Sequence, residues 1–148
     1  MMDILLKFPE RLADLMEERD LTPMTLSKLA NINYSTVTRY LNGARLPSFE
    51  TFIRLLEIFG CSADYMIGLQ NDPMFGMQFL PVPPFCERFA YLLKEKRISQ
   101  YALHKSTGFS YDNFNKWLKG TTSPYLDNLV KLAQAFDCCV DSLLGRIE

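Results

Sequence analysis

Long hydrophobic runs are absent from this chain. Its uninterrupted apolar stretches are only a few residues long, whereas a membrane-spanning helix needs roughly 20. The first residues, MMDILLKF, contain an acid and no extended apolar region. We therefore expect neither a signal peptide nor a membrane anchor.

Residue types that build metal and catalytic sites are scarce. His104 is the only histidine, and Cys61, Cys86, Cys138 and Cys139 show no CxxC or other zinc-binding spacing. A bridge between the vicinal Cys138 and Cys139 would be strained, which favours a reducing, cytoplasmic location. No catalytic signature or phosphate-binding loop is present. The sequence predicts neither an enzyme nor a site for a metal, a cofactor or a small-molecule ligand.

An excess of positive charge is also missing. The formal net charge is −1, so the chain as a whole lacks the basic balance common in nucleic-acid-binding proteins. Hydrophobic residues at 48% and charged residues at 22% are nevertheless typical of a globular protein. Any affinity for nucleic acid must therefore arise locally.

The most informative feature that is present is an internal repeat. Residues 8–69 align without a gap on residues 85–146, a shift of 77 positions, with seventeen identities. A repeat on this scale sets the architecture before any motif is considered. It predicts two domains, residues 1–69 and 85–148, joined by a linker at 70–84.

Each repeat predicts five short helices and no strand. The first helix is expected near residues 9–19, with Pro9 in its first turn. Helix four, expected after Pro47 and Pro124, has an apolar stripe formed by Phe52, Leu55, Leu56 and Phe59, or by Leu129, Leu132, Ala133 and Phe136. The residues expected to cap helices two and three or to end them in tight turns are Thr22, Asn31, Asn33, Gly43, Ser99, Gly108, Ser110 and Gly120.

The segments TPMTLSKLANINYSTVTRYLNGARLPS and SQYALHKSTGFSYDNFNKWLKGTTSPY resemble the helix-turn-helix domains of the Cro and cI repressors, the XRE family. The resemblance covers about 124 of the 148 residues, in two copies at the same spacing. It implies an all-α chain of two tandem five-helix, lambda-repressor-like helix-turn-helix domains joined by an apolar, proline-containing linker. It also implies that helix three of each domain enters the major groove of double-stranded DNA.

Helix three has an apolar and a polar side in both repeats. The positions expected to pack inside are Leu26, Ala30, Ile32, Val37, Tyr40 and Leu41, with Leu103, Thr107, Phe109, Phe114, Trp117 and Leu118 in the second repeat. The polar face, which the resemblance assigns to base contacts, comprises Tyr34, Ser35, Thr36, Thr38, Arg39 and Asn42, then Tyr111, Asp112, Asn113, Asn115, Lys116 and Lys119. Arg39 suits a guanine and Asn113 an adenine. By itself, such a face is also typical of a solvated helix.

The resemblance places phosphate contacts at the start of helix two, at the end of helix three and in the loop behind it, where they hold the register on DNA. The residues concerned are Asn42, Ala44 and Arg45 in the first repeat and Gln100, Lys119, Thr121 and Thr122 in the second. Residues 21–49 contain no acid and residues 98–126 contain only Asp112. The local excess of positive charge therefore arises from the scarcity of acids in these two segments, because the basic residues are not concentrated there.

Three positions depart from the family pattern. The family usually has glutamine at the start of helix two, as at Gln100, but the first repeat has Pro23 and is expected to lack one phosphate contact. The fifth position of the motif is normally small, as at Ser27, so His104 is expected to displace the second recognition helix. Asp112 either faces a base such as cytosine or stabilises the helix N-terminus through the dipole.

The linker, QNDPMFGMQFLPVPP, is more apolar than a free tether, so we expect it to lie against one domain, both domains or a second chain. Fully stretched, it would reach roughly 50 Å, beyond the ~34 Å between adjacent major grooves. The chain either binds an asymmetric site as a monomer or forms a homodimer through the linker.

The expected function is a sequence-specific transcriptional regulator, a repressor from a bacterium or phage. The alternative is a protein-interaction module, antitoxin-like or inhibitor-like, or a hybrid with one repeat on DNA.

Overall fold

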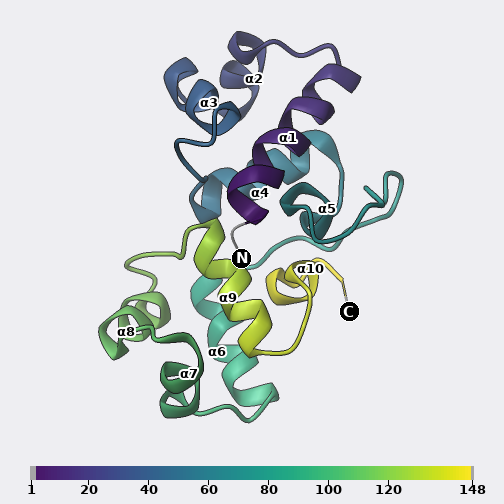
Figure 1. Cartoon of the computed structure of the whole chain (residues 1–148). Helices are drawn as coiled ribbons and strands as arrows, with labels where there is room; N and C mark the ends of the chain where they lie inside the picture. The colour runs from purple at the N-terminus through teal and green to yellow at the C-terminus, as the bar shows by residue number, and fades with distance from the viewer. Residues whose placement is uncertain (1–2, 148) are drawn as a thin grey trace. The chain divides into compact units, whose positions relative to one another are not determined.

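The computed structural model describes residues 3–147, with the side chains of 3–6 excepted. Within that range the chain forms ten helices and no strand (Figure 1). It divides into two compact units, residues 1–77 and 78–148. The first unit contains α1 (Asp3–Glu18), α2 (Pro23–Ala30), α3 (Tyr34–Leu41), α4 (Phe49–Phe59) and α5 (Ala63–Ile67). The second contains α6 (Phe85–Glu95), α7 (Gln100–Thr107), α8 (Tyr111–Lys119), α9 (Leu126–Ala135) and α10 (Val140–Leu144).

Side-chain caps and left-handed residues set most of the helix ends, as the sequence predicts. The hydroxyl of Thr22 accepts a hydrogen bond from the Thr25 amide at 3.1 Å, and that of Ser99 accepts from the Ala102 amide at 3.0 Å. The turns after α2 and α7 have positive φ at Asn31 and Gly108, and those after α3 and α8 at Gly43 and Gly120. Asn33 is the exception, because it occupies the N-cap position of α3 without a side-chain cap bond.

The prediction that Pro9 lies in a first helical turn is wrong. Helix α1 begins at Asp3, so Pro9 lies inside it and removes one backbone hydrogen bond. Complete burial of Phe8 and Leu12 on either side of the proline offsets this loss. The corresponding α6 starts at Phe85, directly after Pro84.

The two cores occupy equivalent positions but differ in aromatic content. The stripes predicted for helix four are buried in both units. In the first unit, Phe8 on α1 meets Tyr40 on α3 edge-on, with the ring centroids 5.9 Å apart. In the second unit, Phe89 contacts Trp117 edge-on at 5.7 Å and Phe114 at 6.0 Å. Such ring pairs add roughly 0.5–1.5 kcal/mol each beyond the area that they bury.

Equivalent arginines fasten the last helix of each unit to the first. Arg11 donates to the carbonyl oxygen of Tyr65 at 2.7 Å, and its guanidinium lies 4.2 Å from the centre of the Tyr65 ring. Burial raises the pKa of the Tyr65 phenol above its ordinary value, and Arg11 opposes this shift. Arg88 donates to the carbonyl oxygens of Ser142 at 2.7 Å and Leu143 at 3.0 Å.

The segment expected to be a linker is held at several points by contacts with each unit. In the first unit, Arg11 donates to the carbonyl oxygen of Gln70 at 2.9 Å, and the Ser62 amide donates to the Pro73 carbonyl at 2.8 Å. In the second unit, the buried Arg146 lies 3.9 Å from the centre of the Phe79 ring, and its carbonyl oxygen accepts from the Leu80 amide at 2.8 Å. The predicted reach of about 50 Å therefore requires both halves to detach.

Candidate nucleic-acid interface

The orientation of α3 and α8 follows from which residues they bury. Val37 and Tyr40 are buried on α3, and Phe114 and Trp117 are buried at the same positions on α8. Residues three apart lie on one side of a helix, so the core holds each helix by that side. The opposite side of each helix therefore points away from its unit.

Most residues predicted to contact DNA are exposed. The exposed set is Tyr34, Ser35, Arg39, Asn42 and Arg45 in the first unit and Tyr111, Asp112, Asn115, Lys116, Lys119, Thr121 and Thr122 in the second. The half-buried set is Thr36, Thr38, Gln100 and Asn113. Among the residues predicted to be core, Ile32, Leu41, Thr107 and Leu118 are half-buried and the other eight are buried.

Among the exposed polar residues, three in each unit form a row along the helix. On α3 the row consists of Ser35, Arg39 and Asn42, and on α8 of Asp112, Lys116 and Lys119, in both cases at positions i, i+4 and i+7. This spacing places three side chains on one helical face. Each unit therefore presents a narrow polar ridge of the kind that a major groove admits.

The two rows carry different charges. On α8 the Asp112 carboxylate lies 3.1 Å from the Lys116 ammonium, and both side chains are solvent-accessible, at 73% and 48%. On α3 the same positions hold Ser35 and Arg39, and no ion pair forms between them. The i, i+4 spacing of Asp112 and Lys116 is a sequence signal for this pair, which the base-contact interpretation of each residue alone overlooked.

The loops after α3 and α8 follow the same path in both units. The Ala44 amide donates to the Arg39 carbonyl oxygen at 2.9 Å, and the Thr121 amide donates to the Lys116 carbonyl oxygen at 2.9 Å. The Asn42 side chain also accepts from the Ala44 amide at 3.0 Å. These bonds hold Arg45 and Thr122, the next residues along, beside the end of each polar row.

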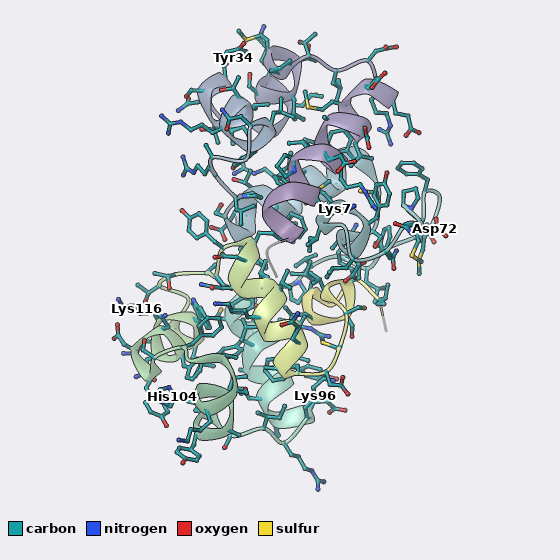
Figure 2. The ribbon with its side chains drawn as sticks, in the orientation of Figure 1. Lys7, Tyr34, Asp72, Lys96, His104 and Lys116 are labelled. Carbon is teal, nitrogen blue, oxygen red and sulfur yellow. The ribbon has the colours of Figure 1, made fainter. Side chains whose placement is uncertain are left out.

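His104 occupies the gap between α7 and α8. Figure 2 labels its side chain on α7. The His104 ring stacks on Tyr111, with the centroids 4.7 Å apart and the planes inclined by 27°. Its Nδ1 lies 2.7 Å from the carbonyl oxygen of Phe109. Because a carbonyl oxygen can only accept a hydrogen bond, Nδ1 is the donor in this bond. The sequence does not reveal this stacking, because the two rings come from different helices.

The small residue at the same place in the first unit produces closer packing. Ser27 is buried between α2 and α3, and its hydroxyl donates to the Met24 carbonyl oxygen at 2.6 Å. Helices α2 and α3 pack more closely than α7 and α8. This difference has the direction expected for a bulky His104.

The first unit also exposes apolar side chains beside its recognition helix. Met24 and Leu29 on α2 are 50% and 55% exposed. The second unit has Tyr101 and Ser106 at these places. Tyr101 is itself 62% exposed, so the units differ at these places mainly in Leu29 and Ser106.

Other kinds of site are not evident in the described part of the chain. Between residues 3 and 147, no three His, Cys, Asp or Glu side chains come together as metal ligands would. No helix in that range is both long and apolar enough to cross a membrane.

Comparison with known families agrees with this geometry. A Cro/C1-type HTH DNA-binding domain model matches residues 88–148, and a helix-turn-helix model matches residues 12–66. Neither model describes a catalytic domain, and the DNA-binding type implies DNA as a partner. No curated protein and no solved structure shows significant similarity to the chain. The chain therefore belongs to the Cro/C1 (XRE) helix-turn-helix family, with one domain of this type at residues 12–66 and a second at residues 88–148.

Proposed function

We propose that the chain is a sequence-specific DNA-binding transcriptional regulator that represses by occupying an operator, with α3 and α8 each lying in a major groove. The observation that carries the proposal is the outward polar row on both helices. Base contacts fall to these rows, and phosphate contacts fall to Arg45, Gln100, Thr121 and Thr122 beside them. The roles agree with the family membership and with the exposure of these side chains, of which Gln100 alone is half-buried.

The first test is a salt titration of the full chain on random duplex DNA, followed by fluorescence anisotropy. Each phosphate neutralised contributes about 0.9 to the negative slope of log K against log salt, so we expect a slope of about 3 to 6. No binding at low salt would contradict the proposal. Selection from a random duplex library then identifies the preferred operator.

Two arginines in the first unit separate base contacts from phosphate contacts. Arg39→Ala removes a guanine-suited side chain, so discrimination at one base pair should fall by about 1–3 kcal/mol. Arg45→Ala should weaken binding to all sequences alike and lower the salt slope by about 1. Lys7→Ala, which removes an exposed charge on α1, is the matched control. Equal, sequence-independent losses in both variants would refute this division.

A second candidate function is a hybrid in which the first unit binds a protein. The exposed Met24 and Leu29 on α2, next to Pro23, favour it. In that case, Arg39→Ala and Arg45→Ala leave DNA affinity unchanged, whereas Lys119→Ala in the second unit reduces it. The same anisotropy series distinguishes the two functions.

A further inference from the structure

Helix α8 carries a charge pair at the centre of its outward face. The Asp112 carboxylate and the Lys116 ammonium are 3.1 Å apart, and both side chains remain accessible. Neither side chain makes another ion pair within the described residues. The second unit therefore presents one acceptor and one donor side by side, on the face that the proposed function directs into a major groove.

Buried aromatic residues of α8 keep the pair on that face. Phe114 lies between Asp112 and Lys116 in sequence and is completely buried, as is nearly all of Trp117. Because these rings anchor α8 in the core, the helix cannot turn the pair inward without losing them. Packing of the two rings therefore fixes the pair on the outward face of α8, where both charged side chains remain accessible to a ligand.

A C·G base pair has the complementary pattern in the major groove. Cytosine presents its N4 amino donor beside guanine O6, and guanine N7 adds a second acceptor next to O6. N4 and O6 are hydrogen-bonded to each other at about 2.9 Å, close to the spacing of the ion pair. An A·T pair is a poorer match, because its central donor is flanked by acceptors on both sides, which repel a carboxylate.

We propose that Asp112 and Lys116 together select a C·G base pair at one position of the half-site of the second unit. Asp112 accepts from cytosine N4, and Lys116 donates to guanine O6 and N7. This inference rests on the proposed DNA-binding function. Specificity here comes partly from rejection, because any base edge without a donor leaves the carboxylate facing an acceptor.

The test uses the full chain and duplexes that differ at the selected position. The native chain should prefer C·G over G·C and A·T by roughly 5- to 150-fold. Asp112→Ser introduces the residue that α3 has at this place, so it should remove most of that preference by strengthening binding to the other bases. Glu95→Gln, which removes an exposed acid on α6, is the charge-matched control and should leave the preference unchanged.

Exchange of the acid and the lysine tests whether the orientation of the pair determines which base pair is preferred. In Asp112→Lys/Lys116→Asp the donor and the acceptor exchange places, so the preference should move to G·C. If Asp112→Ser strengthens binding to every duplex by the same factor, Asp112 acts through its charge alone and the inference is overturned. Salt-dependent DNA binding without a C·G preference also overturns it but leaves the proposed function intact. Absence of binding to every duplex at low salt contradicts the proposed function itself.

Discussion

At the scale of single residues, equivalent positions in the two units have different structural roles. Ser27 lets α2 and α3 approach each other, whereas His104 fills the same gap and stacks on Tyr111 at 4.7 Å. The ring of Tyr111, the first residue of α8, is thereby held in place. No ring contact of this kind involves Tyr34, the corresponding tyrosine of the first unit, among the described residues.

Substitution of His104 tests whether stacking positions Tyr111. His104→Phe keeps an aromatic ring but loses the bond to the Phe109 carbonyl oxygen, and His104→Ser loses both. Because an aromatic pair contributes about 0.5–1.5 kcal/mol, the serine variant should be less stable in urea unfolding. Its DNA affinity should also fall, and the phenylalanine variant should restore part of it. Identical affinities for the two variants would show that the stacking does not matter for binding.

At the scale of elements, helix ends differ in how firmly they are fixed. The Ser110 hydroxyl caps α8 by accepting from the Asn113 amide at 3.1 Å, but Asn33 makes no such bond at the start of α3. Helices α3 and α8 have similar lengths, of eight and nine residues. Only α8 has a side-chain hydrogen bond that caps its N-terminus. The first turn is also where base contacts are proposed, so its order bears on recognition.

This difference predicts unequal effects of removing the two caps. Ser110→Ala should destabilise the second unit by about 1 kcal/mol, because a helix N-terminal amide loses its acceptor. Asn33→Ala should have a smaller effect on the first unit, since no side-chain bond is lost. Chemical denaturation of the full chain, followed by the fluorescence of Trp117 and by circular dichroism, measures both. A larger loss for Asn33→Ala would contradict the cap assignment.

At the scale of the whole molecule, the connection between the units is largely bound. Residues 70–77 belong to the first compact unit, and residues from 78 onwards belong to the second. Arg146 lies against Phe79 and also forms a buried ion pair with Asp141 at 2.7 Å. The polar rows of α3 and α8 also differ, so the two units present different surfaces.

A connection held by contacts with each unit predicts an upper limit on the spacing between half-sites. We expect the affinity of the native chain to fall when base pairs are inserted between the half-sites beyond that limit. Phe79→Ala removes the ring beneath Arg146 and leaves the Asp141 ion pair, so it should broaden the range of spacings bound. Tyr91→Ala, which removes a ring 5.0 Å from the Arg88 guanidinium outside the connection, is the control. A native chain indifferent to spacing would contradict this prediction.

The sequence by itself determined the architecture, because the determinants of helices are local. The repeat, the apolar spacing and the caps at Thr22 and Ser99 depend on residues a few positions apart. The same locality explains why the polar rows of α3 and α8 were predictable. It also explains the error at Pro9, since the local preference of proline for a first turn is overridden by burial of Phe8 and Leu12.

Only the tertiary structure decided the features that join distant residues. Arg11 meets Gln70 and Arg146 meets Phe79 across more than fifty positions. The apolar composition of the linker predicted that it lies against a domain, but only these contacts identify the residues that hold it. The stacking of His104 on Tyr111 likewise depends on how two helices pack. Side-chain contacts between elements follow from the three-dimensional path of the backbone, which no periodicity along the sequence encodes.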